Sequence, residues 1–153
     1  MSDTHEDKVY KYGRGGSDAE HQAHQADITL LLDGHSRLRR VTEHLPNGIR
    51  TCTTSDDPEL AAILLRHAED MKARFAKGRA IRSWDPLFAM LFEQRDTIRV
   101  ELIAREDGLC AELTCTDPAL IPLIHAHDEA LMLFVAEGNA AASKPSPVPP
   151  TTL

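Results

Sequence analysis

The sequence predicts an α+β fold, a two-layer sandwich in which a four-stranded antiparallel sheet is covered by helices on one face. Three observations support this prediction. A pattern of residues recurs 60 positions further along the chain. Each copy contains two short segments that resemble the strands of a hairpin. Each copy then ends in a long amphipathic segment introduced by Asp-Pro, a pair that favours helix starts.

The recurrence appears when the sequence is compared with itself at a shift of 60 residues. Identical residues then fall at matched positions, including glycines, Asp-Pro pairs and one histidine in each copy. The matched pairs include Gly48 with Gly108, Asp57 with Asp117, Pro58 with Pro118, His67 with His127 and Gly78 with Gly138. Two copies are too few for a solenoid, so we interpret them as an internal duplication whose halves share one core around a pseudo-twofold axis.

Composition divides the chain into three parts. We expect a flexible leader over residues 1–25 and a proline-rich disordered tail over 141–153. Between them, residues 26–140 form a single duplicated domain, with repeat one at 26–78 and repeat two at 86–138.

Each repeat begins with a short helix and continues as a hairpin. Apolar clusters at 28–32 and 87–92 suit helices of two to three turns, and Asp85-Pro86 can start the second one. The segment 98–105 alternates apolar and polar residues, as a half-buried strand does, and 38–45 is its less regular counterpart. Asn47-Gly48 and Asp107-Gly108 are expected to supply the positive backbone dihedral angles of tight hairpin turns.

A long helix closes each repeat. Asp57 and Asp117 can accept hydrogen bonds from the free amides of the first turn, and glycines at 78 and 138 end the helices. Apolar residues recur at helical spacing on one side of each segment, which indicates a face packed on the sheet. Pro122 lies early in the second helix and is expected to bend its first turn.

The charge balance limits the partners. The chain carries 24 acidic and 17 basic residues, a net charge of −7. Bulk binding of nucleic acid or of an anionic membrane needs a basic surface, so we expect neither partner. No export signal is evident in residues 1–26, which favours a cytoplasmic protein. An odd number of cysteines, Cys52, Cys110 and Cys115, then argues against a disulfide framework.

The candidate site consists of one histidine from each repeat. His67 and His127 occupy matched positions on the apolar faces of matched helices, so a twofold axis could bring their imidazoles together. Met71 follows His67 by one helical turn and could add a thioether ligand. We therefore predict a metal site of His67, His127 and Met71 that holds haem b or a transition metal. The alternative is a non-catalytic homodimeric interaction module in which both histidines are structural.

Two further features each allow a functional and a structural interpretation. Arg74, Lys77, Arg79 and Arg82 could bind an anionic group such as a haem propionate, or could form a solvated helix face. Cys115 precedes the Asp117 cap, where a thiol can be activated, or is a small apolar side chain at a strand end. No motif of a known enzyme class is present, so catalytic activity is left open.

The segments Leu45-Pro46-Asn47-Gly48, Thr54-Ser55-Asp56-Asp57-Pro58-Glu59 with His67, and Asp85-Pro86-Leu87-Phe88 resemble a group of bacterial proteins without an established activity. Some members accompany cytochrome c modules. The resemblance covers about residues 26–138. It implies haem or redox-metal biology and carries His67 and His127 over as candidate ligands.

Overall fold

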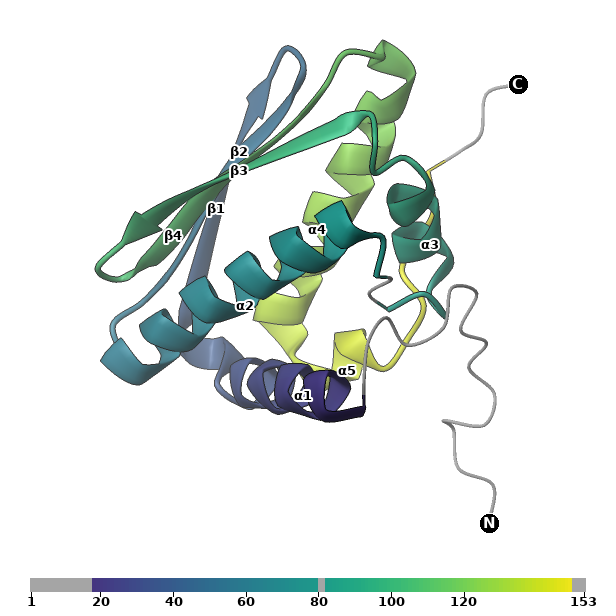
Figure 1. The fold of residues 1–153 in the computed structure, drawn as a ribbon. Coiled ribbons are helices and arrows are strands. Elements are labelled where there is room, and N and C mark those ends of the chain that lie inside the picture. Colours follow the sequence, from purple (N-terminus) through teal and green to yellow (C-terminus); the bar gives the residue numbers. More distant parts are fainter. Residues whose placement is uncertain (1–17, 80–81, 150–153) are drawn as a thin grey trace.

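A computed structural model describes residues 18–79 and 82–149 of the chain and confirms the α+β prediction. A four-stranded antiparallel sheet forms one layer, and the helices lie on one of its faces (Figure 1). The helices are α1 (Asp18–Asp33), α2 (Pro58–Lys77), α3 (Pro86–Glu93), α4 (Ile121–Glu137) and α5 (Asn139–Ala142), with 3-10 turns η2 (His35–Arg37) and η3 (Pro118–Leu120). The strands are β1 (Leu38–Leu45), β2 (Gly48–Ser55), β3 (Ile98–Arg105) and β4 (Gly108–Cys115).

The strand order is β1-β2-β4-β3, so the two hairpins meet through their second strands. Strand β2 pairs with β4 over seven residues, with Thr51 opposite Ala111 near the middle. A two-stranded hairpin alone is marginal in water, whereas four strands can bury one face against helices. The pairing of β2 with β4 therefore makes one sheet out of two unstable units.

The helices cross between the halves. α2 packs on β2, β3 and β4, whereas α4 packs on β1, β2 and β4, and the shorter α1 and α3 lie against α2 and α4 respectively. Two clusters of buried residues fill the space between the layers. The larger contains Ile49, Leu87, Leu91, Ile98, Cys115, Leu123, Ile124 and Ala130. The smaller contains Leu31, Leu60, Ile63, Leu64 and Leu109.

Local signals account for the helix ends. The Asp57 carboxylate accepts hydrogen bonds from the amides of Glu59 and Leu60, and Gly78 ends α2 in the left-handed conformation. Asp117 caps η3 instead of an α-helix, and the α-helical part begins only at Ile121, which leaves Pro122 within the first turn where its missing N–H is harmless. The expected bend at this proline therefore takes the form of a 3-10 turn before the α-helix.

The hairpin turns differ from the expectation. The two-residue loops are Pro46-Asn47 and Glu106-Asp107, because Leu45 pairs with Gly48 and Arg105 with Gly108. Among the described residues, Arg82 is the only non-glycine with a positive φ, so Asn47 and Asp107 do not adopt the predicted dihedral angles. Each glycine instead begins the second strand, where the neighbouring strand approaches closely.

The strands begin at positions that differ by 60, as β1 and β3 do, and η3 begins 60 residues after α2. Common descent of the two halves stays a prediction.

Residues 1–17 of the predicted leader lie outside the described residues, and 18–25 belong to α1. By length and composition alone, Pro118–Glu137 could cross a membrane. A core helix can have the same composition; here 22% of the most apolar stretch is buried, including Leu123 and Ile124.

The close approach at Gly108 yields a stability prediction. A Cβ atom there would lie 2.2 Å from the Thr53 carbonyl oxygen on the neighbouring strand. We expect Gly108→Ala to lower the free energy of unfolding by at least about 3 kcal/mol, since backbone must move. Gly78→Ala is the matched control. It meets only the Arg95 side chain at 3.7 Å and should cost about 1 kcal/mol for its left-handed φ. Urea denaturation measures both, and equal losses would contradict the argument.

Candidate functional site

His67 lies between α2 and α1. Its ring stacks on the ring of His24 at a centroid distance of 5.4 Å, and His24 Nδ1 donates to Asp70 Oδ2 over 2.6 Å. The Nδ1 atom of His67 is buried and accepts no hydrogen bond from the described residues. Burial, with a smaller contribution from the charge of His24, lowers the pKa of His67 to about 4. The imidazole is therefore neutral near pH 7.

His127 has a matching position between α4 and α3. The ring of Phe88 meets it edge-on at 5.3 Å, and its Nδ1 atom is likewise buried with no hydrogen-bond partner among the described residues. Burial, followed by the nearby Arg40 guanidinium, lowers the pKa of His127 to about 4. In each half the ring thus fills the contact between a long helix and a short one.

The surroundings of the two histidines are separate. The charged or titratable groups that act on His67 are His24, Asp27 and Asp70, whereas those acting on His127 are Arg40, Asp85 and Asp128. Met71 is half-buried on α2, in the half of His67. Across residues 18–79 and 82–149, no three His, Cys, Asp or Glu side chains are grouped in a way that could hold a metal ion. A site shared by His67, His127 and Met71 stays a prediction.

The four basic residues predicted to bind an anion are placed differently. Arg74 is buried on α2, whereas Lys77 and Arg79 are exposed at and beyond its end. Arg82 donates from Nε to Asp85 Oδ2 over 2.8 Å and from its two Nη atoms to the carbonyl oxygens of Ala142 and Lys144, each over 2.7 Å. Its guanidinium therefore holds the C-terminal segment in place. Anion binding by Arg74, Lys77, Arg79 and Arg82 stays a prediction.

The C-terminal segment is anchored at one buried carboxylate. Asp85 is fully buried and accepts the backbone N–H of Ser146 at both oxygens over 3.1 Å, and the Ser146 hydroxyl over 2.6 Å. The tail that the sequence suggested from residue 141 therefore includes the end of α5 and a buried serine. Residues 150–153 lie outside the described part of the chain.

A buried ion pair joins the sheet to α4. Two guanidinium nitrogens of Arg40, on β1, donate to Asp128 Oδ1 at 3.2 and 2.9 Å, and both side chains are only 8% exposed. The Thr42 hydroxyl donates to the same oxygen over 2.7 Å, and Arg40 also reaches the hydroxyl of Thr53. Sequence reasoning missed this cluster because its partners are 88 residues apart with no local pattern linking them.

The other face of the sheet, which we call the open face, is not covered by any described helix (Figure 1). Its side chains are the alternate residues of each strand, and the register aligns them in rows across all four strands. The apolar row is Val41, Cys52, Cys110 and Ile103. On one side lies the acidic row of Glu43, Arg50, Glu112 and Glu101, and on the other the basic row of Arg39, Thr54, Gly108 and Arg105.

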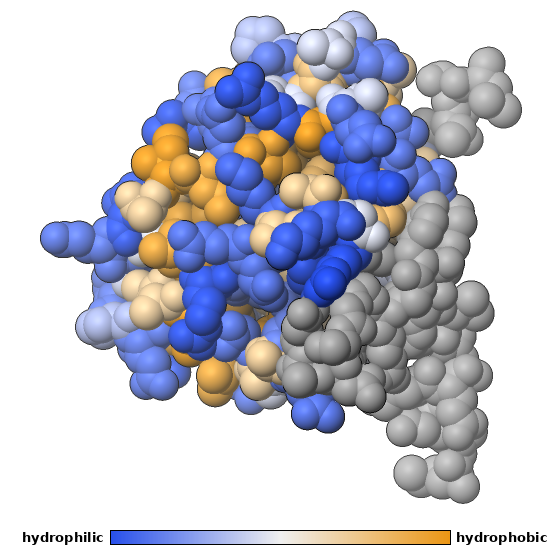
Figure 2. Space-filling model, in the orientation of Figure 1, coloured by the Kyte–Doolittle hydropathy of each residue, from blue (hydrophilic) through white to orange (hydrophobic). Residues whose placement is uncertain are grey.

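Large apolar side chains remain accessible at the ends of the apolar row. Val41 is 62% exposed and Ile103 is 45% exposed, at the two edges of the sheet. On the side of the molecule drawn in Figure 2, hydrophobic residues form patches among hydrophilic ones. The period-two pattern predicted half-buried strands, but only the pairing of β2 with β4 aligns these residues in one row.

The centre of the apolar row is a disulfide bond between Cys52 and Cys110. The expectation that these cysteines form no disulfide framework was therefore wrong. The two cysteines are 58 residues apart and belong to different hairpins, so their pairing arises only when β2 and β4 join in register. Cys115 is free and buried, and burial raises the pKa of its thiol, so it is not an activated nucleophile.

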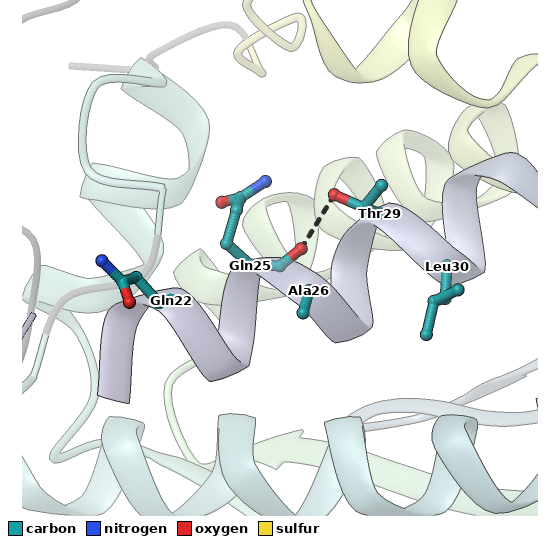
Figure 3. A pocket seen from close by; sticks show the side chains of 5 residues that line it. All are labelled: Gln22, Gln25, Ala26, Thr29 and Leu30. Carbon is teal, nitrogen blue, oxygen red and sulfur yellow. Dashed lines mark hydrogen bonds between the residues drawn. The ribbon is translucent and has the colours of Figure 1, made fainter. Parts of the chain in front are cut away.

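The described surface also has a shallow depression along the outer side of α1. It is lined by Gln22, Gln25, Ala26, Thr29 and Leu30, all from one helix, and the Thr29 hydroxyl donates to the Gln25 carbonyl (Figure 3). Among the described residues, no ionisable or nucleophilic side chain apart from this hydroxyl lines it. The depression therefore brings no convergent chemical groups together.

Comparison of the chain with protein-family models, with curated proteins and with solved structures gave no match. The functional argument therefore rests on the residues and geometry described above.

The lowered pKa values of His67 and His127 predict acid sensitivity. Below pH 6.5 the unfolded chain binds a proton at each histidine before the folded chain does, so stability is retained above that pH and falls toward pH 4. We expect a loss of about 2 kcal/mol per histidine between pH 7 and pH 5. Urea denaturation of His67→Gln and His127→Gln should show a smaller pH dependence than the parent. Exposed His44→Gln is the control, and an unchanged slope in both core variants would contradict the assignment.

Proposed function

We propose that this protein is a non-catalytic interaction module that docks a second copy of itself through the open face of its sheet. The observation that carries the proposal is the apolar row, which lies between one acidic row and one basic row. Exposed Val41 and Ile103 are the apolar anchors at its ends. An exposed apolar strip with charged borders is typical of surfaces that bind another protein.

The charge pattern favours a copy of the same chain as the partner. If the twofold axis of a dimer runs along the apolar row, that row faces its own copy and the acidic row faces the basic row. Arg39 of one subunit then lies opposite Glu43 of the other, and Arg105 opposite Glu101. Because the contact is isologous, each ion pair occurs twice. Arg39 and Glu43 form no ion pair among the described residues, whereas Glu101 already pairs with Arg99 and Arg105 with Asp107.

The other face-to-face arrangement is disfavoured by the same charges. A twofold axis parallel to the strands would place Arg39 opposite Arg105 and Glu43 opposite Glu101, with Arg50 opposite Glu112 as the one favourable contact. Like charges in a partly desolvated interface repel. The rows therefore select one orientation of the partner.

The size of the face sets the strength of the contact. Four strands of eight residues cover about 26 Å by 19 Å, roughly 500 Å² in each copy. This lies below the roughly 800 Å² that each partner contributes to an ordinary stable interface. We therefore expect a reversible dimer with a dissociation constant in the micromolar range or weaker.

In this proposal His67 and His127 are structural. Each neutral ring packs between a long and a short helix, against His24 or Phe88. The recurrence of a histidine in both repeats then reflects the same helix contact made twice.

Metal binding is the second candidate function. The observation that favours it is the buried Nδ1 atom of both His67 and His127, which has no hydrogen-bond partner among the described residues. An imidazole nitrogen with a lone pair is a ligand for transition metals and for haem iron. Since the two rings have separate surroundings, loss of either histidine should affect its own site only, unless the helices rearrange.

The dimer is tested by exchanging the charges that would face each other. We expect Arg39→Glu and Glu43→Arg each to weaken self-association about tenfold, because each reverses two ion pairs. The double variant R39E/E43R should return to the parent value, since the pairs are restored in reverse. Analytical ultracentrifugation over a concentration series measures all four proteins.

Two substitutions of exposed apolar residues by aspartate complete the test. Val41→Asp should abolish self-association, because the row faces its own copy and two carboxylates would meet. Leu133→Asp is the matched control, a 41% exposed leucine on the helix layer, and should have no effect. Failure of the double variant to recover, or loss of association in Leu133→Asp alone, would refute docking through the open face.

Metal binding is tested by titrating the purified protein with copper, zinc and haem separately. If the second candidate is correct, a stoichiometric calorimetric or spectral signal should weaken strongly in His67→Ala or His127→Ala and the parent should melt at a higher temperature with ligand. His21→Ala, close to the start of the chain, is the control. No signal in the parent, with both repeat variants destabilised, would leave these histidines as core residues.

A further inference from the structure

We infer that the Cys52–Cys110 disulfide is a thiol-exchange site that accepts electrons from low-molecular-weight thiols. The bond lies on the open face, at the centre of the sheet, and joins the second strands of the two hairpins. The inference rests on the unequal surroundings of the two sulfurs and does not require the dimer.

The two cysteines of the disulfide differ in solvent exposure. Cys52 is half-buried, whereas Cys110 is 4% exposed. An incoming thiolate must reach the sulfur that it attacks. Cys52 Sγ is therefore the attacked atom and Cys110 Sγ is the leaving group.

A positive charge stands beside the leaving group. Arg105 Nη1 donates toward Cys110 Sγ over 3.9 Å, and the guanidinium is held from its other side by the Asp107 carboxylate at 2.8 and 3.1 Å. A neighbouring guanidinium stabilises a thiolate, and a more stable thiolate leaves faster. Asp107 opposes this effect by partly neutralising the same guanidinium.

The exchange takes place in two balanced steps. A small thiolate attacks Cys52 Sγ and forms a mixed disulfide, and the electron pair of the broken S–S bond leaves on Cys110 Sγ as a thiolate. A second small thiolate attacks the sulfur of the small thiol, and Cys52 leaves as a thiolate that takes a proton from water. Two small thiols are oxidised to one disulfide, and the protein disulfide is reduced by two electrons.

The third cysteine is not a partner in this exchange. Cys115 lies an odd number of residues from Cys110 on the same strand, so its side chain points to the opposite, helix-covered face. The sheet therefore presents one disulfide to solvent and keeps one thiol in the core.

The test compares the rate of reduction of the oxidised full chain by excess glutathione in three proteins. Relative to the parent, Arg105→Gln should slow reduction about threefold, because the Cys110 thiolate loses its counter-ion. Asp107→Asn should speed reduction by a similar factor, because the guanidinium is no longer shared. Acid quenching followed by peptide mass spectrometry should place the glutathione adduct on Cys52.

A second measurement remains available if exchange is too fast to follow. In Cys52→Ser the pH dependence of alkylation at Cys110 reports its thiol pKa, which should rise when Arg105→Gln is added and fall when Asp107→Asn is added. Adducts mainly on Cys110, or variants that shift rate and pKa in the same direction, would overturn the assigned roles of the two sulfurs. A bond that resists glutathione until the chain unfolds would show a purely structural disulfide. The exchange rate of the parent, measured at concentrations well below the dissociation constant of the dimer, separates this outcome from that of the dimer.

Discussion

The antiparallel pairing of β2 with β4 is the contact on which the rest of the structure depends. It joins two hairpins, each too small to bury a face by itself, into a sheet that can hold a helix layer. It also decides which side chains of the two hairpins become neighbours. The Cys52–Cys110 bond joins β2 to β4, and Arg50 on β2 donates to Glu112 on β4 over 3.0 Å. Core, open face and disulfide all follow from the same register.

The helix layer makes it difficult to separate β2 from β4. Because α2 lies partly on β3 and α4 partly on β1, opening the sheet would uncover both helices. The buried ion pair of Arg40 and Asp128 fixes the position of α4 relative to β1. Removing one partner of such a pair leaves an uncompensated charge, whereas replacing both by apolar residues can be neutral. The pair therefore specifies how α4 sits on β1 more than it adds stability.

The two faces of the sheet have different chemistry because side chains alternate along each strand. One face packs apolar residues and a few satisfied polar groups against the helices, and the two core histidines lie in that helix layer as neutral rings. The other face keeps its charges in separate rows with apolar residues and a disulfide between them. If the open face docks a second copy, Cys52 is covered in the dimer, so self-association and thiol exchange would compete for the same surface.

The sequence by itself determined the local features of this protein. Aspartate caps at Asp57 and Asp85, the glycine at 78 and the alternation in 98–105 depend on residues within one turn or one strand, so a single segment is enough to read them. The tertiary structure alone decided that Cys52 meets Cys110, that Arg40 meets Asp128 and that His24 stacks on His67. Those partners lie 58, 88 and 43 residues apart. Such contacts form only when separate elements pack against one another, because no local backbone preference carries information over that separation.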